Sequence, residues 1–479
     1  MFNEMKRIRI LSVLMAALSV ISCHDDWSFS ADSRFVLDFS ADTVRMDTVF
    51  TGVASATACF MVYNTNDVGL RFDAFMNGGT ESPFRMNLDG QGGAGITGLE
   101  IPAGDSLYCF VSVNIPETVA PEPFSATDSI RFVLESGNVQ FVKLSAYGQN
   151  VIRLKGRRIE SDTTLSGGIP YQVYDSLYVA EGVTLTLTGG TCLFFHSGAV
   201  LDVAGRLIAQ GSADSMIVFR GDRLDATETV PPVKYDLLAS QWGGIRIRGG
   251  SYDNVFSFCD IHGGKFGIKA DRDSSDHVKF SVSSSIVHNV AENCIEATGC
   301  SIRIANSQIT NAGAFCVDVA GGWSDFTFCT IAGFSLWTAN SQAVLLSDSR
   351  DNKSVQFIGA QFRNCIITGR HQDEFLTMLS DSVKKTDSYC VSSSLVMTSD
   401  TTDIHFRNVA FDRHGTSWGG PSNFRDNTVQ GYASVFYLDS LSHARGIADS
   451  LSVEWPIDLR GVSRPTEGAD AGCYQFFSD

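Results

Sequence analysis

A short phrase recurs through Val255–Thr368, and its spacing constrains the fold more than any other feature of the chain. Each copy places a cysteine or serine two residues before a β-branched residue, as in Cys259/Ile261, Ser285/Val287, Ser307/Ile309, Cys329/Ile331 and Cys365/Ile367. The steps between copies are 285−259=26, 307−285=22, 329−307=22 and 365−329=36 residues. Strand-like segments that repeat every 22 or so residues are typical of a parallel β-solenoid, in which each repeat forms one coil.

A second series runs in phase with the first, because Gly267, Cys294 and Cys316 follow one another at steps of 294−267=27 and 316−294=22 residues. We therefore expect two strands per coil. The cysteines and serines of both series are predicted to stack in the core, where a coil needs small buried side chains. A disulfide between Cys294 and Cys316 is the alternative, since neighbouring coils lie one strand spacing apart.

Residues 35–150 have a different pattern. They contain seven runs of alternating apolar and polar residues, separated by turn signals such as Gly-Gly and Asp-Gly. Short alternating strands at this density are typical of an immunoglobulin-like antiparallel β-sandwich. This part of the chain carries no recognisable catalytic constellation.

From residue 151 onward, strands of four to six residues alternate with glycine corners, as in YVAEGVTLTLTGGTCLFF and FHSGAVLDVAGRLIAQGS. These stretches resemble the opening coils of right-handed parallel β-helices of the pectate-lyase-like superfamily. The resemblance implies an all-β chain in which a right-handed parallel β-helix (solenoid) over residues 151–479 follows the N-terminal immunoglobulin-like sandwich. Two loop insertions are expected to interrupt the β-helix, at 223–240 and at about 338–354.

The end of the chain carries a second resemblance. The phrase DLRGVSRPTEGADAGCYQFF resembles the closing phrase of a set of secreted β-helix proteins, and Asp458, Arg464 and Tyr474 are among the matching residues. Cys473 departs from that pattern, which usually has alanine there. Because a solenoid must cover its last coil, the phrase is predicted to form a C-terminal cap.

The N-terminus reads as a targeting segment. A basic start, MFNEMKRIR, precedes an apolar run that falls short of the roughly 18 residues of a membrane span, so residues 1–22 are predicted to be a signal peptide. The run ends at Val20-Ile21-Ser22-Cys23, which resembles the bacterial lipobox and implies a lipid on Cys23. An uncleaved signal anchor is the alternative. Residues 23–34 are expected to form a tether.

The residues just after Cys23 bear on localisation. His24-Asp25-Asp26 looks like the surface-export tag of Bacteroidota lipoproteins, which implies an outer-membrane lipoprotein exposed at the cell surface and held by its N-terminal lipid.

The net charge of −17 argues against nucleic acid as a partner, because an acidic surface repels phosphate backbones. The partners we expect are a polysaccharide or other envelope proteins.

The sharpest candidate for catalysis is the stretch GGKFGIKADRD. A β-elimination lyase needs a basic group such as lysine and neutralisation of a uronate carboxylate, and Lys265, Lys269, Asp271, Arg272 and Asp273 offer such groups. Asp271 and Asp273 are also the residues that would hold a calcium ion, the one cofactor that the pattern leaves open. A solvated charged turn explains the same residues without any chemistry.

Three further groups are candidates for binding. His262 and His288 lie one coil apart, 288−262=26, and would stack on one edge. Such a pair would bind a metal or line a glycan groove, while two histidines that merely occupy coil corners are the alternative. Trp418 belongs to an aromatic loop that would stack on a sugar ring. Glu296 and Asp318 are predicted to be neighbours on one sheet, 318−296=22. Such a pair would share a proton or bind a cation, but outward carboxylates on a solvated face are the favoured interpretation.

No zinc-like cysteine or histidine spacing, phosphate-binding loop or nucleophile elbow occurs in the chain, and the sequence predicts no metal site. The favoured function is therefore a non-catalytic carbohydrate-binding or envelope-organising β-helix. The alternative is a polysaccharide lyase or glycoside hydrolase that acts on a surface or dietary glycan.

Overall fold

The computed structural model describes residues 28–55, 57–227, 229–272, 277–336, 338–385, 388–414, 417–425 and 436–477. The predicted signal peptide, Cys23 and Asp273 lie outside the described residues, and so does the side chain of Trp418. Among the described residues, no helix is long and apolar enough to cross a membrane.

The chain forms two compact units. The first comprises the described residues up to Thr118 together with Pro123–Gln149, and the second comprises Val119–Glu122 and the residues from Asn150 onward. The prediction of an all-β chain with an immunoglobulin-like sandwich followed by a parallel β-helix is confirmed.

The first unit is a sandwich of two five-stranded sheets. The first sheet has the order β1 (Asp38–Phe39), β3 (Ala58–Tyr63), β8 (Ser106–Val113), β5 (Phe84–Leu88), β6 (Gln91–Gly93). The second has the order β2 (Thr43–Phe50), β10 (Val139–Gln149), β9 (Phe124–Leu134), β4 (Leu70–Met76), β7 (Gly95–Ile101), and a short 3-10 turn, η1 (Gly79–Glu81), follows β4. Alternate residues of both sheets, such as Phe60 and Phe132, meet in one buried core.

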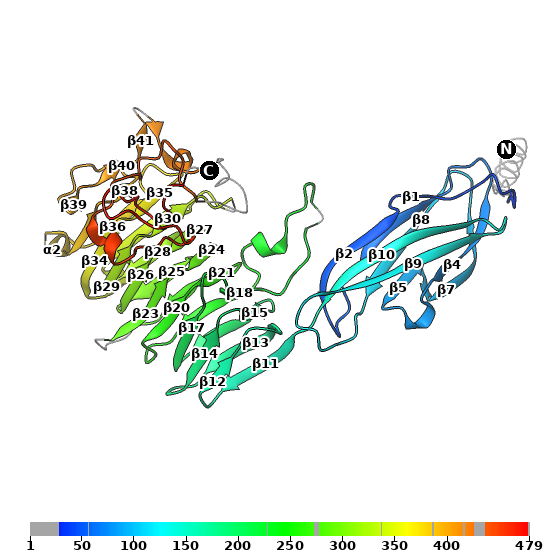
Figure 1. The fold of residues 1–479 in the computed structure, drawn as a ribbon, viewed down its shortest axis with the longest axis horizontal. Coiled ribbons are helices and arrows are strands. Elements are labelled where there is room, and N and C mark those ends of the chain that lie inside the picture. Colours follow the sequence, from blue (N-terminus) through cyan, green and yellow to red (C-terminus); the bar gives the residue numbers. More distant parts are fainter. Residues whose placement is uncertain are drawn as a thin grey trace, which may run out of the picture. The chain divides into compact units, whose positions relative to one another are not determined.

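The second unit is a β-helix built from three ladders of parallel strands (Figure 1). Ladder A contains β15 (Cys192–Phe195), β18 (Ile217–Gly221), β21 (Cys259–His262), β24 (Ile286–Val290), β27 (Gln308–Ala312), β30 (Thr330–Gly333), β35 (Ile366–Gly369), β38 (Leu395–Val396) and β40 (Ala410–Phe411).

Ladder B joins ladder A in one 18-stranded sheet through β13, which pairs with both β15 and β16. It contains β11 (Ile152–Ile159), β13 (Tyr171–Val179), β16 (Val200–Val203), β19 (Gly244–Ile247), β22 (Ile268–Ala270), β25 (Ile295–Thr298), β28 (Phe315–Ala320), β31 (Gln342–Ser347) and β36 (Phe375–Met378).

Ladder C is the separate 10-stranded sheet. It contains β12 (Thr163–Leu165), β14 (Thr184–Thr188), β17 (Arg206–Gln210), β20 (Asn254–Ser257), β23 (Val278–Ser283), β26 (Ser301–Ala305), β29 (Gly322–Thr327), β34 (Phe357–Arg363), β37 (Tyr389–Ser392) and β39 (Phe406–Arg407). The remaining elements are η2 (Tyr235–Leu237), α2 (Asp381–Lys384), η3 (Gly420–Asn423), η5 (Ser450–Val453), β32 (Ser349–Arg350), β33 (Lys353–Ser354), β41 (Arg413–His414) and β42 (Ser417–Trp418).

The prediction of two strands per coil is wrong, because each repeated phrase contains two strands rather than one. In VFSFCDIHGG, β20 ends at Ser257, β21 begins at Cys259, and Phe258 between them has a left-handed backbone with φ of 50°. A single left-handed residue turns the chain from ladder C into ladder A. The equivalent corners in later coils are Ser284, Asn306, Phe328 and Asn364.

The cysteines and serines of the repeat stack inside the coils, as predicted. Cys259, Ser285 and Ser307 are fully buried. The Ser285 hydroxyl accepts a hydrogen bond from the Cys259 amide at 2.9 Å, and the Ser307 hydroxyl accepts one from the Ser285 amide at 3.1 Å. These side chains satisfy backbone donors that the corner leaves without a strand partner. Cys294 and Cys316 are also buried, and no disulfide joins them.

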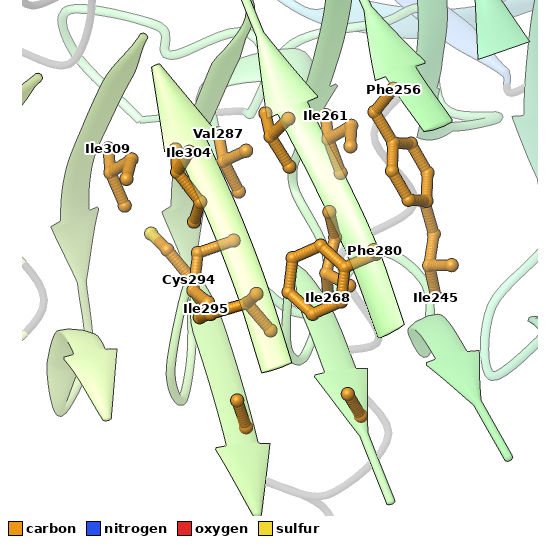
Figure 2. Packing of buried hydrophobic residues seen from close by; sticks show 14 of the residues in the cluster. Ile245, Phe256, Ile261, Ile268, Phe280, Val287, Cys294, Ile295, Ile304 and Ile309 are labelled. Carbon is orange, nitrogen blue, oxygen red and sulfur yellow. The ribbon is translucent and has the colours of Figure 1, made fainter. Parts of the chain in front are cut away.

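Apolar side chains of successive coils form rows in the interior (Figure 2). Ile261, Val287 and Ile309 are in register on ladder A, and Ile268 and Ile295 on ladder B. Each lies in the same core, where a fully buried aliphatic side chain contributes about 1.5–3 kcal/mol relative to exposure. Stacking of like residues therefore supplies both the stability and the register of the coils.

The second insertion is placed differently from the prediction. Gln342–Ser347 within the expected loop forms β31, a regular strand of ladder B. The extra residues fall on either side of it, in the connection before β31 and in the β32–β33 hairpin. The apolar residues Val344 and Leu346 keep the strand in the core.

The closing phrase also differs from its prediction as a cap. The C-terminal segment, residues 436–477, lies against the outer side of ladder A. Tyr474 Oη donates to Gln308 Oε1 at 2.9 Å, and the Cys473 amide donates to Thr330 Oγ1 at 3.1 Å. The Gly472 amide donates to the Asn364 carbonyl at 2.8 Å. The segment therefore runs along the side of successive coils, where it covers the apolar outward side chains Ala332, Ile366 and Leu395.

Candidate functional site

Polar side chains gather on the outer side of ladder A at β21 and β24. These strands lie next to the coils that the C-terminal segment covers. Strand alternation turns Cys259 and Ile261 of β21 inward, and so turns Asp260 and His262 outward. Parallel register places His262 beside His288 of β24. The structure thus brings together the two histidines that the sequence predicted to stack, with ring centroids 4.9 Å apart.

The first insertion supplies another carboxylate to the same place. Its turn η2 carries Asp236, whose Oδ1 lies 2.7 Å from His262 Nε2 and 2.8 Å from the Arg220 guanidinium of β18. The neighbouring Tyr235 ring lies against the Arg223 guanidinium, 3.4 Å from its carbon to the ring centroid. The insertion therefore folds back onto ladder A.

His262 is held between two carboxylates. Its Nδ1 lies 2.8 Å from Asp260 Oδ1, while its Nε2 contacts Asp236. Carboxylate oxygens only accept hydrogen bonds, so both ring nitrogens donate and the ring is an imidazolium. Burial by itself would lower the pKa of His262, but the charges and hydrogen bonds of Asp260 and Asp236 outweigh it and raise the pKa to about 9.

The same contacts act on the carboxylates. Burial favours the neutral acid of Asp260, yet the charges and hydrogen bonds of His262 and His288 hold its pKa well below the usual range. Burial would also raise the pKa of Asp236. The hydrogen bond and charge of His262 and the charge of Arg220 outweigh burial and lower that pKa. His288 Nε2 lies 3.2 Å from Asp260 Oδ1, so that oxygen faces both histidines.

The C-terminal segment completes a pocket over this cluster. Its aromatic residues Phe436, Tyr437 and Tyr474 form one wall, and Tyr437 and Tyr474 meet edge to face with ring centroids 4.9 Å apart. The volume is about 380 Å³, and the remaining lining residues are Asp236, Leu237, Asp260, His262, Ile286, His288 and Gln308. We call this space the histidine pocket.

The carboxylates of the histidine pocket are poorly suited to glycoside hydrolysis. That reaction needs one protonated carboxylic acid and one carboxylate that faces the sugar or a water. Asp236 and Asp260 are instead both ionised and are both hydrogen-bonded to the same imidazolium. The arrangement is better suited to hold a polar ligand or a cation than to transfer a proton.

Two charged residues of the predicted lyase stretch, Lys265 and Lys269, line a second hollow of about 580 Å³ on the outer side of ladder B. Arg246 and Glu292 line the same hollow. Lys265 Nζ lies 3.4 Å from Glu292, and Lys269 Nζ lies 2.9 Å from Glu296. An ammonium group that is paired with a carboxylate is not a ready base for proton abstraction.

Asp271 is paired as well, since both Nε and Nη2 of Arg246 donate to its Oδ2, at 3.1 and 2.8 Å. Arg272, the next residue, is exposed, and Asp273 lies outside the described residues. The two aspartates that would hold calcium therefore stay a prediction of the sequence alone.

Glu296 and Asp318 are neighbours on ladder B, as their spacing predicted. Their expected exposure is wrong, because Glu296 is 9% and Asp318 is 4% exposed. Arg350, from the β32–β33 hairpin, makes two hydrogen bonds to Asp318 at 2.6 and 2.8 Å. Asn293 donates to both carboxylates. The hairpin insertion covers what the sequence suggested was a solvated face.

Sequence reasoning missed most of the histidine pocket. Asp260 was within reach, because it lies two residues before His262 on the same strand and so shares its outward face. Asp236 and Tyr437 lie on segments with no repeat, and nothing in their local sequence indicates that they contact ladder A.

No protein-family model matches the chain, and no curated protein is similar to it in sequence. Among solved structures, a family 123 glycoside hydrolase from Clostridium perfringens is similar over 23% of this chain and 23% of its own, with 11% identity and a TM-score of 0.18. A protein of unknown function from Porphyromonas gingivalis W83 is similar over 26% of this chain and 60% of its own, with 12% identity and a TM-score of 0.18.

A PapD-like domain of human CEP192 is similar over 24% of this chain and 84% of its own, with 8% identity and a TM-score of 0.17. This chain thus spans less than two thirds of the glycoside hydrolase and of the Porphyromonas gingivalis protein. Likenesses of this extent carry no argument about function.

Proposed function

We propose that the chain is an exported, lipid-anchored protein of the cell surface whose β-helix binds a carbohydrate in the histidine pocket without transforming it. The observation that carries the proposal is the make-up of that pocket. An aromatic wall faces a floor of hydrogen-bonding groups, which suits the apolar faces and hydroxyl edges of a sugar ring.

The charges on the floor of the histidine pocket restrict the class of ligand that fits. Asp260 and Asp236 are balanced by His262 and Arg220, so the floor presents paired charges and the amide of Gln308 rather than a strong field of one sign. A neutral or weakly charged saccharide fits this floor better than a polyanion. The pocket volume of about 380 Å³ suits one or two sugar rings.

Replacing Tyr437 by alanine is expected to weaken carbohydrate binding by roughly tenfold or more, about 1.4 kcal/mol, because it removes one of the three rings of the aromatic wall. The measurement is a glycan-array screen of the full chain, followed by calorimetric titration of the best ligand. Tyr252→Ala is the matched control, since Tyr252 is an exposed β-helix tyrosine stacked on His277 outside the pocket. Equal losses in both variants, or an array without a ligand, would contradict the proposal.

The same samples test the enzyme alternative. A polysaccharide lyase would produce unsaturated uronates that absorb ultraviolet light, and a glycoside hydrolase would produce new reducing ends. We expect neither product, because no described carboxylate of the histidine pocket is poised as an acid and the lysines beside ladder B are paired. Turnover by the full chain would replace the binding proposal with the enzymatic one.

The export part of the proposal rests on the N-terminal pattern and on the resemblance to Bacteroidota lipoproteins with a pectate-lyase-like β-helix. Cys23→Ala is expected to move the protein from the membrane fraction to the soluble fraction, because a lipid can no longer be attached. The measurement is fractionation of cells followed by detection of the protein. Cys59→Ala, which removes an exposed cysteine of the sandwich, should leave the distribution unchanged.

A further inference from the structure

The cluster at the floor of the histidine pocket has the make-up of a metal site. We propose that Asp260, His262 and His288 form the ligand set of a divalent transition-metal ion of the zinc type. One ligand atom from each of the three residues lies within 4.8 Å of the other two. The sequence raised a metal only as one alternative for the two histidines, and carbohydrate binding in the pocket neither requires nor excludes one.

The distances match a metal at the centre of the three groups. Asp260 Oδ1 lies 2.8 Å from His262 Nδ1 and 3.2 Å from His288 Nε2. Ligand bonds of about 2.0–2.2 Å in a tetrahedral site place neighbouring ligand atoms roughly 3.3 Å apart. These two separations are within about 0.5 Å of that spacing, and the ligand atoms of the two histidines lie within 4.8 Å of each other.

The other nitrogen of His262 is already oriented as in a metal site. Its Nε2 lies 2.7 Å from Asp236 Oδ1, which accepts the Nε2–H and leaves Nδ1 aimed at Asp260. A histidine ligand usually donates its second N–H to a carboxylate in this way, which fixes the ring and raises its basicity. Asp236 is in turn held by Arg220 at 2.8 Å. The first insertion thus supplies the outer support of the site.

The fold holds the three ligands on a rigid base. Asp260 and His262 project from one strand, and His288 lies in register on the next strand of ladder A. Two imidazoles and a carboxylate favour zinc and its neighbours over calcium and magnesium, which prefer oxygen ligands throughout. Three protein ligands leave at least one coordination position, and all three residues line the histidine pocket.

Metal binding competes with the ion pairs of the metal-free protein. In that form a proton on His262 Nδ1 joins it to Asp260, and a bound metal takes the place of that proton. The hydrogen bond from Nε2 to Asp236 persists in both forms. The ion pair between His262 and Asp260 is therefore the metal-free form of the site.

The test is titration of the full chain with ZnCl₂ after treatment with a chelator and dialysis, followed by calorimetry. Co²⁺ in place of Zn²⁺ gives visible absorption bands that report nitrogen and oxygen ligands. We expect one saturable site that His288→Ala and Asp260→Asn each weaken at least tenfold. Asp236→Asn should weaken binding by about 10–100-fold, as is usual for an outer partner of a histidine ligand.

His196→Ala is the matched control, because His196 forms a 2.9 Å pair with Asp222 but belongs to no potential metal-ligand cluster among the described residues. It should bind zinc like the unchanged chain. Zinc should also raise the melting temperature of the unchanged chain and of His196→Ala, but not of His288→Ala. Circular dichroism shows whether each variant is folded.

Several results would overturn the proposal. Absence of saturable zinc binding up to millimolar concentration is one, and equal affinity in His288→Ala and His196→Ala is another. Because these titrations contain no carbohydrate, failure of the metal site is distinguishable from failure of carbohydrate binding.

Discussion

Replacing Arg464 by alanine should detach the C-terminal segment from the β-helix and lower the free energy of unfolding by roughly 3 kcal/mol or more. Arg464 is 6% exposed, and its guanidinium donates to the carbonyls of Trp455, Ile457 and Gly472 at 3.0, 2.8 and 3.2 Å. It also donates to Asn306 Oδ1 at 2.7 Å. Alanine would leave several buried acceptors without a donor.

A second contact adds to this effect. The Arg464 guanidinium carbon lies 4.2 Å from the centroid of Phe328, a left-handed corner of the coils. Burial lowers the pKa of Arg464 to about 10, which still leaves it charged at neutral pH. One cation thus joins the segment to two corners of the β-helix, Asn306 and Phe328.

The measurement is urea denaturation combined with limited proteolysis. Arg464→Ala should make the chain after Phe436 sensitive to protease, and it should weaken carbohydrate binding because Tyr437 and Tyr474 lose their position. Arg445→Ala is the control, since Arg445 is an exposed residue of the same segment that lies against Phe476. A resistant C-terminal segment in Arg464→Ala would contradict this account of how the segment is held.

Phe326→Ala should lower the free energy of unfolding by about 3–5 kcal/mol, through loss of buried surface and creation of a cavity. Phe326 of β29 is fully buried and in register with Phe362 of β34. The two rings are stacked, with centroids 4.6 Å apart and an interplanar angle of 1°. Because a coil contacts only its neighbours, a cavity at this level interrupts the row of stacked side chains.

The measurement is the urea concentration at the midpoint of unfolding, compared between Phe326→Ala and the control Ile358→Ala. The slope of the unfolding free energy against urea concentration should stay unchanged. Ile358 lies on β34 as well, but it is 61% exposed, so its truncation should change stability by no more than about 0.5 kcal/mol. Similar losses in both variants would show that the stacked rings contribute little beyond their place on the strand.

The architecture of the β-helix was largely predictable, because each coil repeats the same physical requirement. Cys259, Ser285 and Ser307 occupy equivalent buried positions, and a spacing of 22 to 26 residues reports the length of a coil directly. The third ladder was missed because Phe258 and its equivalents turn the chain with one residue. A turn of one ordinary residue has no glycine or proline to mark it.

The candidate site was predictable only in part. The repeat predicted that His262 and His288 would be neighbours, and it predicted the pairing of Glu296 with Asp318. It gave no indication that Arg350 would cover Asp318, because that contact comes from an insertion outside the period.

The sequence by itself determined an all-β chain, the period of its coils, and which side chains face the interior and which face outward. These properties follow from strand alternation and from repetition, which are local. Only the tertiary structure decided where the insertion with Asp236 folds and where the segment with Tyr437 and Tyr474 lies. Those positions depend on contacts between residues far apart in the chain, and no period records such contacts. The histidine pocket exists because two non-repeating segments meet one repeating face.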